Sequence, residues 1–168
     1  MVVVSSLVEV ATELRQRARL QEPPYSTSQI IDACFDAAVT GRILPDGVDE
    51  LVTRTSDGYL IVYHRDLPIA EQRFAIAHAL AHIIFDGDVA GCSVGFAGDP
   101  EREARADRFA LELLVPLDEL APYVGRWPSA DEAEHEAYLD QVDMIASHFN
   151  VPACRIDERI RELERMTK

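Results

Sequence analysis

The chain has 168 residues, of which 48% are hydrophobic, so its length and composition suit one soluble globular domain with a buried core. Its 16 Lys and Arg residues against 30 Asp and Glu residues give a formal net charge of −14, which argues against direct nucleic-acid binding. No apolar run reaches the length of a membrane span and the start lacks a signal peptide's basic residues, so we expect no membrane contact. Cys34, Cys92 and Cys154 are odd in number and far apart, which favours a reducing cytoplasm over a disulfide framework.

The N-terminal third is predicted to form two amphipathic helices followed by a small sheet. Residues 6–20 carry one apolar stripe, and a second helix is expected from the Ser/Thr cluster at 26–28 to about Ala38. Residues 50–55 and 59–64 alternate between apolar and polar side chains, as half-buried strands do. The Asp57-Gly58 pair between them supplies the positive φ that a tight hairpin turn needs.

Helical periodicity returns over residues 69–85 and from Pro100 to about Val115, where Asp99 is the predicted N-cap and Pro100 the first helical residue. Two more helices are expected over residues 129–149 and 152–166. We therefore predict a mostly helical α+β fold, organised as one domain over residues 1–168. Its parts are N-terminal helices over 1–40, the antiparallel sheet and two central helices over 41–124, and C-terminal helices over 125–168.

Two histidines on the first central helix have the spacing of metal ligands. His78 and His82 are four residues apart, so both imidazoles project from one helix face. A catalytic zinc site needs a third protein ligand and an open position for water. Glu103 and Asp107 on the next helix are also four apart. One of them can coordinate the metal while the other hydrogen-bonds to a ligand histidine.

The segments QRFAIAHALAH (72–82) and EREARADRFALELLVP (101–116) resemble the metal-binding segments of the ImmA/IrrE zinc metallopeptidases. The resemblance covers most of residues 40–165, including the hairpin and the closing helices. It implies a zincin-like fold, bound Zn²⁺ and metallopeptidase activity. It also implies that His78, His82 and Glu103 are the zinc ligands and that Asp107 lies behind them.

The chain departs from the family at position 79, where the family has a glutamate and this sequence has Ala79. That glutamate acts as general base and then general acid in peptide hydrolysis, and its loss costs on the order of 10² to 10⁴ in rate. Zinc binding should survive while turnover largely fails. Two explanations stay open: a peptidase whose glutamate was deliberately replaced, which the otherwise intact motif favours, or a natural pseudo-peptidase that binds a partner or senses zinc.

The resemblance implies that the substrate is one specific protein, a helix-turn-helix transcriptional repressor. An acidic surface suits a basic partner, because opposite net charges raise encounter rates. The C-terminal helices offer a competing interpretation as a DNA reader. However, Arg155, Arg159 and Glu162 are interpreted as a solvated face with paired charges.

His64, just after the second predicted strand, is a candidate oxyanion donor for the cleft. The competing interpretation is an exposed histidine at a strand end.

Overall fold

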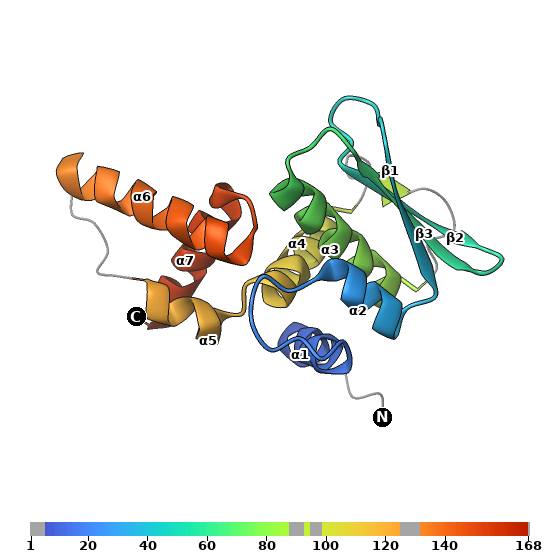
Figure 1. The fold of residues 1–168 in the computed structure, drawn as a ribbon, viewed down its shortest axis with the longest axis horizontal. Helices are drawn as coiled ribbons and strands as arrows, with labels where there is room; N and C mark the ends of the chain where they lie inside the picture. Colours follow the sequence, from blue (N-terminus) through green and yellow to red (C-terminus); the bar gives the residue numbers. More distant parts are fainter. Residues whose placement is uncertain (1–5, 88–92, 95–98, 125–131, 168) are drawn as a thin grey trace.

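The computed structural model describes residues 6–87, 93–94, 99–124 and 132–167, and it shows a mostly helical α+β fold. A small sheet lies on one side of the central helices α3 (Ile69–Phe85) and α4 (Pro100–Leu114). On their other side lie α5 (Leu117–Leu120), α6 (Glu132–Phe149) and α7 (Ala153–Thr167), as Figure 1 shows. The predicted fold class is confirmed.

The N-terminal helices are α1 (Leu7–Arg17) and α2 (Thr27–Cys34). Helix α1 begins with a capping box, in which the Ser6 hydroxyl accepts from the Glu9 N–H and the Glu9 carboxylate accepts from the Ser6 N–H. Helix α2 ends at Cys34, four residues before the predicted end. Residues 37–42 instead form a strand, because Ala37 and Ala38 pair with another strand rather than continuing the helix.

The sheet contains β1 (Ala37–Arg42), β2 (Glu50–Thr55), β3 (Gly58–His64) and the two-residue β4 (Ser93–Val94), in the order β1-β3-β2-β4. Strands β2 and β3 form the predicted antiparallel hairpin. Strand β1 runs parallel to β3, so the sheet is mixed and not wholly antiparallel as predicted. A parallel pair needs a long connection, and periodicity within one segment cannot reveal it.

Glycine is required at position 58. Gly58 has a φ of +129°, and a Cβ added there would lie 1.9 Å from the Asp36 carbonyl oxygen. The Tyr59 N–H also donates to that carbonyl, over 2.8 Å. The predicted positive φ thus serves both the hairpin turn and the close approach of the chain ahead of β1.

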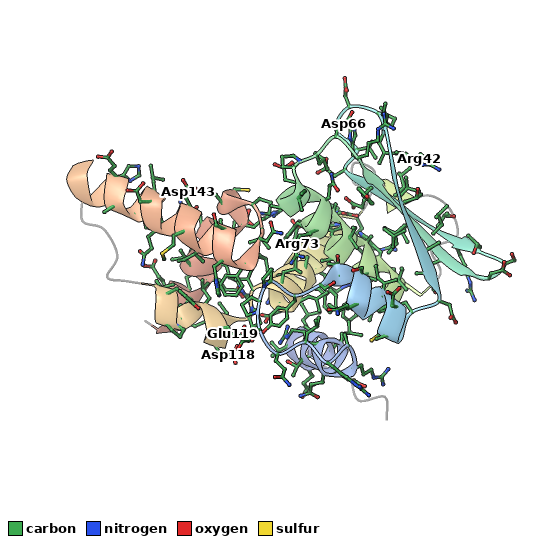
Figure 2. All side chains as sticks on the ribbon, viewed as in Figure 1. Arg42, Asp66, Arg73, Asp118, Glu119 and Asp143 are labelled. Atoms are coloured by element: carbon green, nitrogen blue, oxygen red, sulfur yellow. The ribbon has the colours of Figure 1, made fainter. Side chains whose placement is uncertain are left out.

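Helix α3 is the centre of the core. Ten consecutive residues, Phe74 to Ile83, are buried, because α3 packs against the sheet, α2 and α4. Arg73 links this helix to the segment before α2 and to the segment between α6 and α7. Its guanidinium donates to the carbonyls of Tyr25, over 2.8 Å, and Asn150, over 3.0 Å. Figure 2 shows Arg73 between α3 and the C-terminal helices. These contacts anchor α3 a little ahead of the turn that carries its two histidines.

Helix α4 starts as predicted, with Asp99 as N-cap and Pro100 in the first turn. Cys34 and Cys154 are free thiols, and Cys92 lies outside the described residues. Within the part of the chain that the structure describes, no helix is long and apolar enough to cross a membrane.

Candidate metal centre

Helices α3 and α4 bring His78, His82 and Glu103 together. The Nε2 atoms of the two histidines are 3.0 Å apart, and Glu103 Oε2 lies 3.1 Å from His78 Nε2 and 3.6 Å from His82 Nε2. Both imidazoles are buried, and Glu103 is partly buried. Among the described residues, these three form the group of side chains that could hold a metal ion.

The spacing of the three ligand atoms fits zinc. Zinc–nitrogen and zinc–oxygen bonds of about 2.0 to 2.1 Å in a tetrahedral arrangement separate neighbouring ligand atoms by about 3.3 Å. The separations here are 3.0, 3.1 and 3.6 Å. Two histidines and one glutamate are also a donor set found in catalytic zinc sites. The centre therefore suits a divalent cation, and bound zinc would polarise a substrate carbonyl and activate water.

A carboxylate supports each imidazole from behind. Asp107 Oδ1 lies 2.9 Å from His78 Nδ1, and Asp86 Oδ2 lies 2.7 Å from His82 Nδ1. A proton on each Nδ1 can therefore be donated to a carboxylate, which leaves both Nε2 lone pairs free to face a metal. The sequence pointed to Asp107 for this position. Asp86 was missed, although its spacing of four residues from His82 was a usable signal.

Arginines hold these two aspartates in place. Asp86 forms ion pairs with Arg105 and with Arg102, the latter over 3.0 Å, and Arg155 from α7 forms an ion pair with Asp107 over 3.2 Å. Burial raises the pKa of both aspartates, but hydrogen bonds and charges outweigh it. Those from Arg102 and His82 act on Asp86, those from His78 and Arg155 act on Asp107, and both pKa values fall below their ordinary range. Both groups therefore remain carboxylates.

Burial also opposes protonation of His78 by lowering its pKa. The hydrogen bond that His78 donates to Asp107 and the charges of Glu50, Asp107 and Glu103 act the other way, and the net result is a raised pKa. Several carboxylates thus stabilise positive charge at this position. A metal cation there would benefit from the same field.

A cavity of about 350 Å³ opens beside the centre, and His78, Glu103 and Asp107 line it. Glu50 from β2 lines it too, with Oε1 3.7 Å from His78 Nε2. Burial raises the pKa of Glu50 to about 7. The sequence provided no signal for Glu50, because only the packing of β2 against α3 brings it to this cavity.

Ala79 is completely buried and belongs to the hydrophobic core, and it is not among the residues that line this cavity. Its methyl group has no proton to exchange. Position 79 therefore contributes no acid or base to the cavity.

His64 ends β3, and its Nδ1 accepts a hydrogen bond from the Asp66 N–H over 3.2 Å. It is not among the residues that line the cavity. The structure therefore does not bring His64 together with the three metal-facing side chains.

The prediction that Arg155, Arg159 and Glu162 form a solvated face of the C-terminal helix is wrong. Arg159 is fully buried, and its guanidinium contacts Glu112 over 2.7 Å, Glu162 over 2.5 Å and the Val115 carbonyl over 3.0 Å. Arg155 is partly buried against Phe74 and Asp107. A charge pattern cannot distinguish an exposed arginine from one that crosses the core to reach an acidic partner. Arg159 is therefore a structural link between α7 and the end of α4.

The two histidines one helical turn apart, the glutamate from the next helix and the small sheet beside them agree with the arrangement that the resemblance to zinc metallopeptidases implies. A family model described as the IrrE N-terminal-like domain, Peptidase M78, matches residues 42–161, and the chain belongs to this family. The match begins at the end of β1, so α1 and α2 lie ahead of it.

Among solved structures, the chain is similar to a Mycobacterium tuberculosis transcriptional regulator, with a TM-score of 0.57 and 17% sequence identity. The similarity covers 89% of this chain and 44% of that chain, so this chain spans less than half the length of the regulator. At this identity the likeness shows the fold alone. A comparison with curated proteins finds no match.

Proposed function

We propose that this chain is a zinc-dependent endopeptidase that cleaves one specific protein, a helix-turn-helix transcriptional repressor, and that it is present here in a form without the general-base glutamate, which Ala79 leaves inactive or strongly impaired. The observation that carries the proposal is the convergence of His78, His82 and Glu103 beside a cavity, in a chain of the M78 peptidase family. Each ligand histidine keeps its supporting carboxylate. An intact metal centre without a base at position 79 supports retained metal binding with slow turnover.

Two observations support a regulatory protein as the partner. The chain carries a net charge of −14, which favours encounter with a basic protein. The same fold occurs in a mycobacterial transcriptional regulator, where it makes up part of a longer chain. The free thiols of Cys34 and Cys154 support a cytoplasmic site of action.

A second candidate is a natural pseudo-peptidase that acts as a protein-binding or zinc-sensing module. The observation behind this candidate is that position 79 is completely buried in the hydrophobic core and contributes no acid or base to the cavity. In this reading the alanine belongs to the natural sequence. Both candidates bind the metal and the partner. They differ in whether a glutamate at position 79 gives the protein peptidase activity.

The decisive experiment mixes the parent chain and Ala79→Glu with purified helix-turn-helix repressors, with and without a chelator. The endopeptidase proposal expects discrete fragments from Ala79→Glu at least about 10²-fold faster than from the parent, and none with chelator or with an added His82→Ala. Partner binding without any cleavage by Ala79→Glu would favour the binding module. Absence of both binding and cleavage across the candidates would reject the repressor as partner.

A further inference from the structure

Glu50 is a buried carboxylate without a hydrogen-bond partner among the described residues. It is the first residue of β2, and its side chain is only 10% exposed. Its one ionic contact within the described chain is with His78, at 3.7 Å. Burial of a carboxylate that receives no hydrogen bond from the protein is costly unless a cation compensates for it.

The protein groups around Glu50 do not supply that compensation. Glu103 and Asp107 are negative and line the same cavity, and Asp49 precedes Glu50 in the chain. Arg155 also lines the cavity, but its ion pairs are with Asp107 and Glu158. Within the described chain, the imidazole of His78 is therefore the group that can carry positive charge in ionic contact with Glu50. A divalent cation at the neighbouring centre would add the missing charge.

Position 79 and Glu50 differ in what they contribute to the cavity. Position 79 of helix α3 contributes a buried methyl group and no carboxylate to the cavity. Strand β2 contributes Glu50 to the same cavity, close to the same histidine. The sheet thus places a buried carboxylate near His78, while position 79 provides none.

We propose that Glu50, from strand β2, is a further carboxylate of the metal centre. Its negative charge stabilises a cation bound by His78, His82 and Glu103. Glu50 lies outside the three-residue group whose ligand atoms are all within 4.8 Å of one another. Its role is therefore that of a neighbouring negative charge and not of a fourth member of that group. The inference rests on the metal binding in the proposed function and does not depend on peptide cleavage.

The test compares zinc affinity, measured by competition with a chromophoric chelator, in the parent, Glu50→Gln and Glu71→Gln. Glu71 lines the same cavity from the first turn of α3 but is exposed, so its variant removes an equal charge without burial. We expect Glu50→Gln to weaken zinc binding about 10- to 100-fold. Glu71→Gln should stay within about threefold of the parent, because water and salt screen its charge.

Two further readouts separate this role from a structural one. Glu50→Gln should leave the metal-free protein at least as resistant to urea as the parent, because it removes an uncompensated buried charge. It should also change the visible spectrum of the Co²⁺-loaded protein, while Glu71→Gln should not. Unchanged zinc affinity in Glu50→Gln, or a loss matched by a loss of metal-free stability, would overturn the inference. A parent that binds no zinc would reject the metal centre itself and, with it, the proposed function.

Discussion

His82 and Asp86 lie one helical turn apart at the end of α3, with Asp86 Oδ2 2.7 Å from His82 Nδ1. Both side chains are only 3% exposed, and Arg102 and Arg105 bind the same carboxylate. The pair orients one histidine of the candidate metal centre and links it to helix α4. It therefore fixes the orientation of the His82 ring at the metal centre.

Replacing Asp86 should weaken zinc binding without abolishing it. We expect Asp86→Ala to lower zinc affinity about 10- to 100-fold, because His82 loses the acceptor that orients its ring. Chelator competition measures this change. The matched control is Glu101→Ala, which removes an exposed acid from the first turn of α4. Equal affinities in Asp86→Ala and the parent would show that the ring is held by packing alone.

Removing a ligand should empty the centre. Elemental analysis of the purified parent should find about one zinc per chain, since three protein ligands define one tetrahedral site. His82→Ala and Glu103→Ala should each retain far less zinc, while Glu71→Ala should match the parent. Stoichiometric zinc in both ligand variants would place the metal elsewhere in the protein.

The metal-free protein should lose stability as the pH rises above about 4.5. The pKa of Glu50 is raised from 4.5 to about 7 on folding, so between these values the folded state binds more protons than the unfolded state. The free energy of unfolding therefore falls with pH across this window, by at most about 3 kcal/mol. The pKa of His78 is also raised on folding, from its ordinary value of 6.5. Just above pH 6.5 the folded state therefore again binds more protons than the unfolded state, and the free energy of unfolding falls further as the pH rises.

Urea denaturation in the presence of a chelator, at several pH values, measures this dependence. Glu50→Gln should remove most of the slope between pH 4.5 and 7. Below about pH 4 the trend should reverse, because the lowered pKa values of Asp86 and Asp107 mean that their stabilisation is lost on protonation. Equal slopes in the parent and Glu50→Gln would show that Glu50 is not the group responsible.

Arg159 should be essential for stability. Arg159→Ala leaves the largely buried carboxylate of Glu112 without its partner, and we expect a loss of about 3 to 5 kcal/mol in the free energy of unfolding. The control is Arg161→Ala on the same helix, whose ion pair with Asp157 is 64% exposed on the arginine side and should contribute at most about 1 kcal/mol. Similar urea midpoints for both variants would contradict the structural role of Arg159.

Much of the metal centre follows from the sequence because its spacing is local. A helical repeat of 3.6 residues places His78 and His82 on one face, and the same rule applies to Glu103 and Asp107. Asp99 and Pro100 start α4 through bonds within one turn, and Gly58 supplies its own positive φ. Each of these features depends on residues only a few positions apart.

The tertiary structure alone decided which distant groups meet this centre. Strand β1 pairs in parallel with β3, although β2 lies between them in the chain. Glu50 approaches His78 through the packing of β2 on α3, and the buried Arg159 pairs with Glu112. Local periodicity and charge pattern are the same whether such side chains face water or a neighbouring element. Their partners are chosen by how the sheet and helices pack, and that choice depends on the whole chain.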